Sequence, residues 1–76
     1  MSEFHRTRYK IFNLIKTLRE EKGISQRQLA EIVGLSRNAL ASIERNEAEP
    51  SVRIAYCISL YFEKPVNEVF IIQQIV

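Results

Sequence analysis

The chain contains only two glycines, Gly23 and Gly34, and each is followed two residues later by a serine. Glycine readily takes the left-handed backbone conformation that ends many helices. Serine is favoured at the start of a helix, because its hydroxyl accepts a backbone N–H of the first turn. The sequence therefore predicts three short helices in close succession, separated by two very short turns.

The first helix is expected over about residues 7–22. Ile11, Ile15 and Leu18 recur at the i, i+4 and i+7 positions, which lie on one face of a helix. The second helix is expected to begin at Ser25, where Gln28 three residues later completes a capping box. Its apolar stripe would consist of Leu29, Ile32 and Val33.

Three more segments show helical patterns. A third helix is expected over about residues 37–45, with Leu40 and Ile43 facing inward. Ser51 is expected to cap a fourth helix over about residues 52–62. Its inward residues would be Val52, Ala55, Ile58 and Phe62.

A short fifth helix would begin at Pro65, because proline suits the first helical position, and would end near Phe70. Residues 71–76 are apolar and could extend this helix or form a short strand. The expectation is an all-α, five-helix, compact fold in a single domain spanning residues 1–76.

The most specific stretch is residues 26–45. A turn made only of Gly34 and Leu35 cannot let two helices pack antiparallel, so it predicts the steep crossing of a helix-turn-helix unit. Ala30 supplies the small residue that a close crossing requires. Apolar residues on both sides of the turn would fix the angle: Leu29, Val33, Leu35, Leu40 and Ile43.

In these residues the chain resembles the repressor and Cro-type helix-turn-helix family, also called the xenobiotic-response-element family. The resemblance covers about residues 11–70. It is carried by the segments 18–26, Leu29-Ala30, Gly34-Leu35-Ser36, 42–46 and Pro50-Ser51. Many members have glycine where Asn46 stands, and asparagine also tolerates a left-handed conformation.

The resemblance implies a lambda-repressor-like fold that binds duplex DNA in a sequence-specific way, with residues 36–45 as the recognition helix in the major groove. The opening residues of such a helix face base edges. Arginine can bond guanine and asparagine adenine with two hydrogen bonds each, and an outward alanine can meet a thymine methyl group. The expected base contacts are Ser36, Arg37, Asn38, Ala41 and Ser42.

Contacts with the DNA backbone are expected at both ends of the unit. Gln26 opens the second helix, where its amide and free backbone N–H groups could hold a phosphate. The weaker candidates are Arg27, Arg45 and Asn46. In relatives, the residues matching Arg19 and Glu44 form a salt bridge between the first and third helices, so this pair is interpreted as structural.

Composition argues against other classes of protein. One cysteine and one histidine cannot build a zinc site or an internal disulfide. The sequence shows no catalytic set and no glycine-rich phosphate loop, so we expect no enzyme, cofactor, metal or small-molecule ligand. Its longest apolar run is about four residues, far short of the roughly 20 of a membrane span. The unpaired Cys57 fits the reducing cytoplasm.

A homodimer is expected, because one recognition helix covers only about four to five base pairs and regulators of this type pair two units about 34 Å apart. Residues 52–76 are the expected dimerisation region. The homodimer is expected to bind a palindromic operator. Their apolar surplus consists of Ile54, Tyr56, Leu60, Tyr61, Val69, Ile71, Ile72, Ile75 and Val76. Repression is expected over activation by analogy with small relatives. The alternative is an antitoxin-like module that grips another protein.

Overall fold

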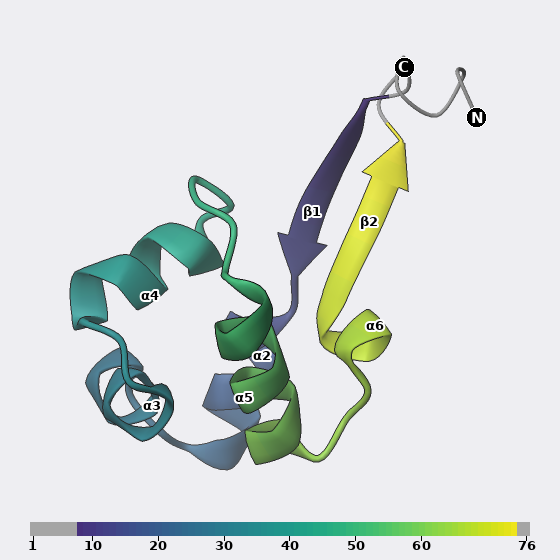
Figure 1. Ribbon diagram of the computed structural model, residues 1–76. Coiled ribbons are helices and arrows are strands. Elements are labelled where there is room, and N and C mark those ends of the chain that lie inside the picture. Colours follow the sequence, from purple (N-terminus) through teal and green to yellow (C-terminus); the bar gives the residue numbers. More distant parts are fainter. Residues whose placement is uncertain (1–7, 75–76) are drawn as a thin grey trace.

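The computed structural model describes residues 8–74 (Figure 1). The expected helix start at residue 7 and the dimer candidates Ile75 and Val76 lie outside these residues. The elements in chain order are strand β1 (Tyr9–Asn13), helices α2 (Ile15–Lys22), α3 (Gln26–Val33), α4 (Arg37–Glu44), α5 (Val52–Phe62) and α6 (Val66–Val69), and strand β2 (Phe70–Gln74). Figure 1 shows the helices gathered in one body and the two strands leaving it side by side.

The five expected helices are present, but the all-α prediction is wrong. Strands β1 and β2 form an antiparallel two-stranded sheet, in register from Tyr9 opposite Gln74 to Asn13 opposite Phe70. The first helix begins at Ile15 and not near residue 7. Tyrosine, isoleucine and phenylalanine favour strands, and β1 contains all three. Of the two alternatives for the tail, the strand is correct over residues 71–74.

Asn13 is the residue at which strand gives way to helix. Its side-chain oxygen accepts the Ile15 N–H at 3.1 Å, a local turn typical of asparagine. The next backbone N–H, of Leu14, donates to the Val69 carbonyl at 2.9 Å. The Asn13 amide nitrogen donates to the Ile43 carbonyl at the end of α4 at 2.8 Å. This side chain therefore ties the sheet to the helical body.

The expected serine caps and glycine helix ends are confirmed. Ser25, Ser36 and Ser51 each accept a first-turn backbone N–H, and Ser25 with Gln28 forms the complete capping box. Gly34 ends α3 with a φ of 82°, and Asn46 has a φ of 62° after α4. Pro65 differs slightly from its expected place, because it precedes the first residue of α6.

The core is one cluster to which all five helices and the start of β2 contribute. Its members are Ile15, Leu18, Leu29, Ala30, Val33, Leu40, Ile43, Ile54, Ile58, Phe62, Val69 and Phe70. Two inward assignments were wrong, because Ile32 is 52% exposed and Val52 is 73% exposed. The inward face of α5 runs through Ile54, and this residue and Val69 are therefore unavailable to a dimer surface.

Candidate nucleic-acid interface

Helices α3 and α4, which are expected to contact DNA, are joined by the short turn of Gly34 and Leu35. The N–H groups of Gly34 and Leu35 both donate to the Ala30 carbonyl, at 2.9 and 2.8 Å. Ala30 itself is only 2% exposed, so the small residue lies where the helices approach. Leu40 and Ile43 face the core from α4. The start of α4, at Arg37 and Asn38, is therefore exposed to solvent in a fixed orientation.

Three of the expected base-contact residues lie exposed at the start of α4, namely Ser36, Arg37 and Asn38. The Ser36 oxygen accepts the Ala39 N–H at 3.1 Å, which leaves its hydroxyl proton available to another acceptor. Ser42, one turn further along, is half-buried. The start of α4 thus presents donors and acceptors suited to base edges.

The expectation that Ala41 faces outward is wrong, because this residue is 7% exposed. Little of the methyl group remains for a thymine to contact. The contact of Ala41 with a base stays a prediction that rests on this small exposed surface.

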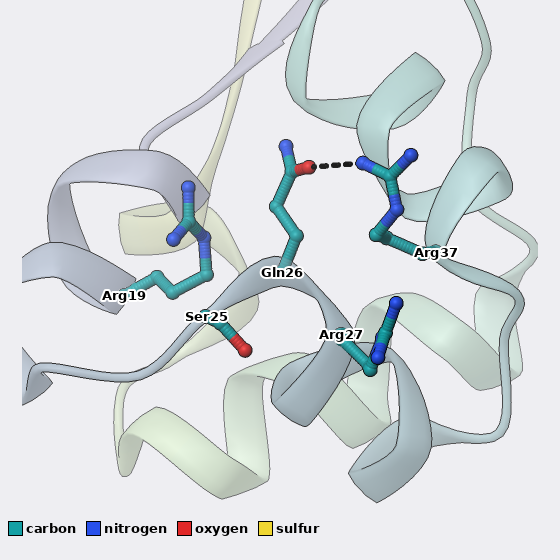
Figure 2. A pocket seen from close by; sticks show the side chains of 5 residues that line it. All are labelled: Arg19, Ser25, Gln26, Arg27 and Arg37. Carbon is teal, nitrogen blue, oxygen red and sulfur yellow. Dashed lines mark hydrogen bonds between the residues drawn. The ribbon is translucent and has the colours of Figure 1, made fainter.

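An open hollow lies beside α4 at the start of α3. Its lining residues are Arg19, Ser25, Gln26, Arg27 and Arg37. Figure 2 shows the Gln26 side chain standing between Arg19 and Arg37, joined to Arg37 by a hydrogen bond. In that bond the Arg37 Nη1 donates to the Gln26 Oε1 at 3.3 Å. The hollow combines three arginines with a helix N-terminus, a combination that suits an anion.

The Arg19–Glu44 salt bridge is confirmed. Arg19 Nε donates to Glu44 Oε2 at 2.9 Å and Arg19 Nη2 donates to Glu44 Oε1 at 3.3 Å. The side chains are only 11% and 4% exposed. Arg19 Nη1 also donates to the Ile24 carbonyl at 3.0 Å. The pair therefore joins α2, the following turn and α4.

One contact of Glu44 was missed by sequence reasoning. The Gln26 amide nitrogen donates to Glu44 Oε1 at 3.0 Å, so Gln26 is bound to a carboxylate as well as to Arg37. Spacing along the chain gave no signal for this bond, because it forms between two different helices. Asn13 was also missed, although an asparagine just before a helix is a known start signal.

The end of α4 carries the remaining backbone-contact candidates. Arg45 is exposed and its Nη2 donates to Glu47 Oε1 at 2.9 Å. This hydrogen bond and the opposite charge raise the pKa of Arg45 and lower the pKa of Glu47. The Asn46 side-chain oxygen accepts from Asn13 Nδ2 at 3.1 Å. Both candidates therefore already have a side-chain partner within the protein.

Metal sites and membrane-spanning helices are absent from the described residues 8–74. No group of three or more His, Cys, Asp or Glu side chains there is placed to hold a metal ion. Within the same residues, no helix has the length and apolar character that crossing a membrane requires.

The family model described as helix-turn-helix matches residues 15–69. The chain belongs to this helix-turn-helix family. Its resemblance to repressor and Cro-type regulators is thereby confirmed, and the family is one of DNA-binding transcriptional regulators. Neither β1 nor β2 lies within the residues that match the family model, which end at Val69.

Relatives of this helix-turn-helix protein are described as transcriptional regulators. An uncharacterized regulator of Bacillus subtilis, YgzD, is 36% identical over 62 residues, covering 82% of this chain and 94% of that protein. The Escherichia coli regulator SutR is 39% identical over 53 residues, covering 70% of this chain and 30% of SutR. A putative regulatory protein of Thermococcus gammatolerans is 40% identical over 55 residues, 72% of this chain. This chain spans only 17% of the Thermococcus protein's length.

A solved structure supports the same fold. The crystal structure of the restriction-modification controller protein C.AhdI from Aeromonas hydrophila matches this helix-turn-helix protein with a TM-score of 0.65. The two sequences are 28% identical, and the match covers 71% of this chain and 82% of C.AhdI. The helical body is therefore similar to that of a known controller protein.

Proposed function

We propose that the protein is a small transcriptional regulator that binds a specific duplex DNA sequence with α4 in the major groove. The observation that carries the proposal is the exposure of Arg37 and Asn38 at the start of a helix whose other side is buried in the core. Arginine can bond guanine O6 and N7, and asparagine can bond adenine N6 and N7. Ser36 and Ser42 would add single hydrogen bonds beside them.

Backbone phosphates would lie against both ends of the unit. At the start of α3, Arg27 lines the open hollow, and a helix N-terminus beside an arginine suits a phosphate. At the other end, Arg45 and Asn46 would meet the opposite strand. Such contacts set the register of the protein on DNA but carry no sequence information.

The test begins with selection of bound duplexes from a random pool, which gives the operator. Arg37→Ala and Asn38→Ala should each lower discrimination at one base pair by about 5- to 150-fold. The matched control is Arg27→Ala, which should weaken all sequences alike and reduce the salt dependence of binding. The assignment of α4 fails if Arg37→Ala retains the full preference for the operator.

The protein is further proposed to act as a homodimer on a palindromic operator. Val52, Tyr56 and Leu60, here called the α5 stripe, recur at every fourth position of α5 and are 73%, 59% and 75% exposed. A helix apolar on its solvent side is normally covered by another surface. Two copies related by a twofold axis would cover each other's stripes with identical contacts.

Sedimentation of the free protein and of its operator complex tests the dimer. The wild type should sediment as a dimer, and Leu60→Arg should shift it to a monomer whose operator affinity is reduced. A wild type that remains monomeric at high concentration and binds one half-site at a time would exclude the dimer. We propose repression over activation by analogy with small relatives, and a cytoplasmic location because the unpaired Cys57 fits a reducing compartment.

A second candidate function is an antitoxin-like module that grips another protein. The exposed α5 stripe is the observation that favours it, because such a face would also suit a foreign partner. Selected DNA without a consensus, together with a partner that co-purifies, would support this alternative.

A further inference from the structure

We propose that the buried carboxylate of Glu44 sets the position of the DNA-reading guanidinium of Arg37, acting through the amide of Gln26. This inference rests on the proposed function, in which Arg37 reads a base. Gln26 then acts as a positioning residue, and its primary role differs from the phosphate contact expected from the sequence.

Glu44 is the fixed end of this chain of contacts. Its side chain is 4% exposed, and two hydrogen bonds from Arg19 engage both of its oxygens. A fork of this kind holds a carboxylate in one orientation. Arg19 is anchored in turn by the Ile24 carbonyl. The carboxylate is therefore held rigidly before any DNA is present.

The Glu44 carboxylate determines which way the Gln26 amide points. An ionised carboxylate accepts hydrogen bonds and has none to donate. Gln26 must therefore turn its NH₂ group toward Glu44, where the nitrogen lies 3.0 Å from Oε1. A flipped amide would place its oxygen against the carboxylate oxygen. The Gln26 oxygen consequently faces the other way, toward Arg37.

The oriented amide gives Arg37 a defined partner. Arg37 Nη1 donates to Gln26 Oε1 at 3.3 Å, and Nη2 lies 3.5 Å from the Asn38 side-chain oxygen (Figure 2 shows the first of these bonds). A guanidinium has five N–H donors, so others remain for a guanine. A long, exposed arginine would otherwise lose much side-chain freedom on binding. Holding it in advance favours recognition at its base pair.

A double-mutant cycle with Gln26→Met and Arg37→Ala tests the inference. Methionine keeps the length of glutamine and removes its hydrogen bonds. Gln26→Met should lower discrimination at the base pair read by Arg37 by about 2- to 10-fold, the range expected for one hydrogen bond. In the Arg37→Ala background, the same change should have no further effect on discrimination.

Two outcomes of the cycle would overturn the inference in different ways. If Gln26→Met weakens all sequences equally in both backgrounds, Gln26 is a phosphate contact and the positioning role is wrong. If Arg37→Ala alone leaves discrimination intact, the base assignment of the proposed function fails and the inference fails with it. Arg27→Met serves as control, since it changes the same hollow and should show no coupling to Arg37.

A measurement without DNA isolates the role of Glu44. Nitrogen relaxation of the Arg37 Nε–H group should report a more mobile side chain in Gln26→Met. The same should occur in Arg19→Met/Glu44→Met, which replaces the buried ion pair by packed apolar groups, a change that many folds tolerate. Unchanged Arg37 mobility in a folded double variant would overturn the role of Glu44. Unchanged Arg37 mobility in Gln26→Met would overturn that role as well, because Glu44 reaches Arg37 only through Gln26.

Discussion

The helix pair α3–α4 and the sheet formed by β1 and β2, here called the strand arm, are held in place in different ways. The helix pair has a capped start on each helix, a glycine turn and five residues in the core cluster, Leu29, Ala30, Val33, Leu40 and Ile43. The strand arm is anchored mainly at its base, through Asn13 and Phe70. Beyond Phe70, residues 71–74 of β2 are all exposed.

The helix pair contributes most to keeping the protein folded, whereas the strand arm offers apolar surface to a partner. A two-stranded sheet alone is marginally stable in water. The strand arm nevertheless carries Ile71 and Ile72, which are 41% and 63% exposed. An open apolar groove lies where it meets α5 and α6. Substitutions should therefore affect stability in the helix pair and association in the strand arm.

The largest effect is expected for Leu40→Ala in α4. Leu40 is fully buried, and truncation of such a side chain costs about 2–5 kcal/mol through lost burial and a cavity. Urea unfolding monitored by circular dichroism measures the change. A loss below about 1 kcal/mol would show that the helix pair is not the stable region that the comparison describes.

Gly34→Ala should have the next largest effect. The added methyl group meets no atom within 4 Å, but the φ of 82° is strained for any residue with a Cβ. We expect a loss of about 1–2 kcal/mol from backbone strain alone. Thermal unfolding measures this loss. Gly23→Ala, with a φ of 72° and equal space, should show a loss of similar size for the same reason. Equal stability of Gly34→Ala and wild type would contradict this reading of the turn.

Ile72→Thr in the strand arm should cost the monomer little, within about 0.5 kcal/mol, because the side chain is 63% exposed and threonine suits a strand. Its effect should appear instead in sedimentation, as weaker self-association. Together with the result for Leu40→Ala, this outcome would show that stability depends on the helix pair and association on the strand arm. A large loss of stability at low protein concentration would instead assign Ile72 to the core of the monomer.

The smallest effect concerns the ion pair of Arg45 and Glu47. The hydrogen bond from Arg45 lowers the pKa of Glu47 below its ordinary value of 4.5. The pair therefore stabilises the fold above that value, and its contribution is lost as the pH falls through the lowered pKa. A carbon NMR titration should show the Glu47 pKa returning to its ordinary value in Arg45→Met. An identical titration curve in both proteins would contradict the pairing.

Much of the helical body could be predicted because its signals are local. Ser25, Ser36 and Ser51 with the two glycines mark helix ends through bonds to near neighbours. The sheet could not be predicted in the same way, since β1 and β2 pair across almost the whole chain. Ile11 gives a false helical signal, because its spacing to Ile15 and Leu18 matches a helix although it lies in β1.

The sequence predicted which residues lie at the candidate site, but it predicted the contacts among them less well. Arg37 and Asn38 lie exposed at the start of α4, as the resemblance implied. Their roles in DNA binding stay predictions. The bond from Gln26 to Glu44 depends on the three-dimensional crossing of α3 and α4, which sequence spacing does not encode. Ala41 is likewise only 7% exposed, although it lies off the inward stripe that Leu40 and Ile43 define.

The pairing of β1 with β2 has a consequence for the order of events during synthesis. The ribosome releases β1 first and β2 only after the five helices. Until β2 appears, the backbone groups of β1 form hydrogen bonds with water. Closing so long a loop is slow compared with forming a helix. The helices can therefore assemble on the emerging chain, whereas the sheet is completed only once Phe70–Gln74 has left the exit tunnel.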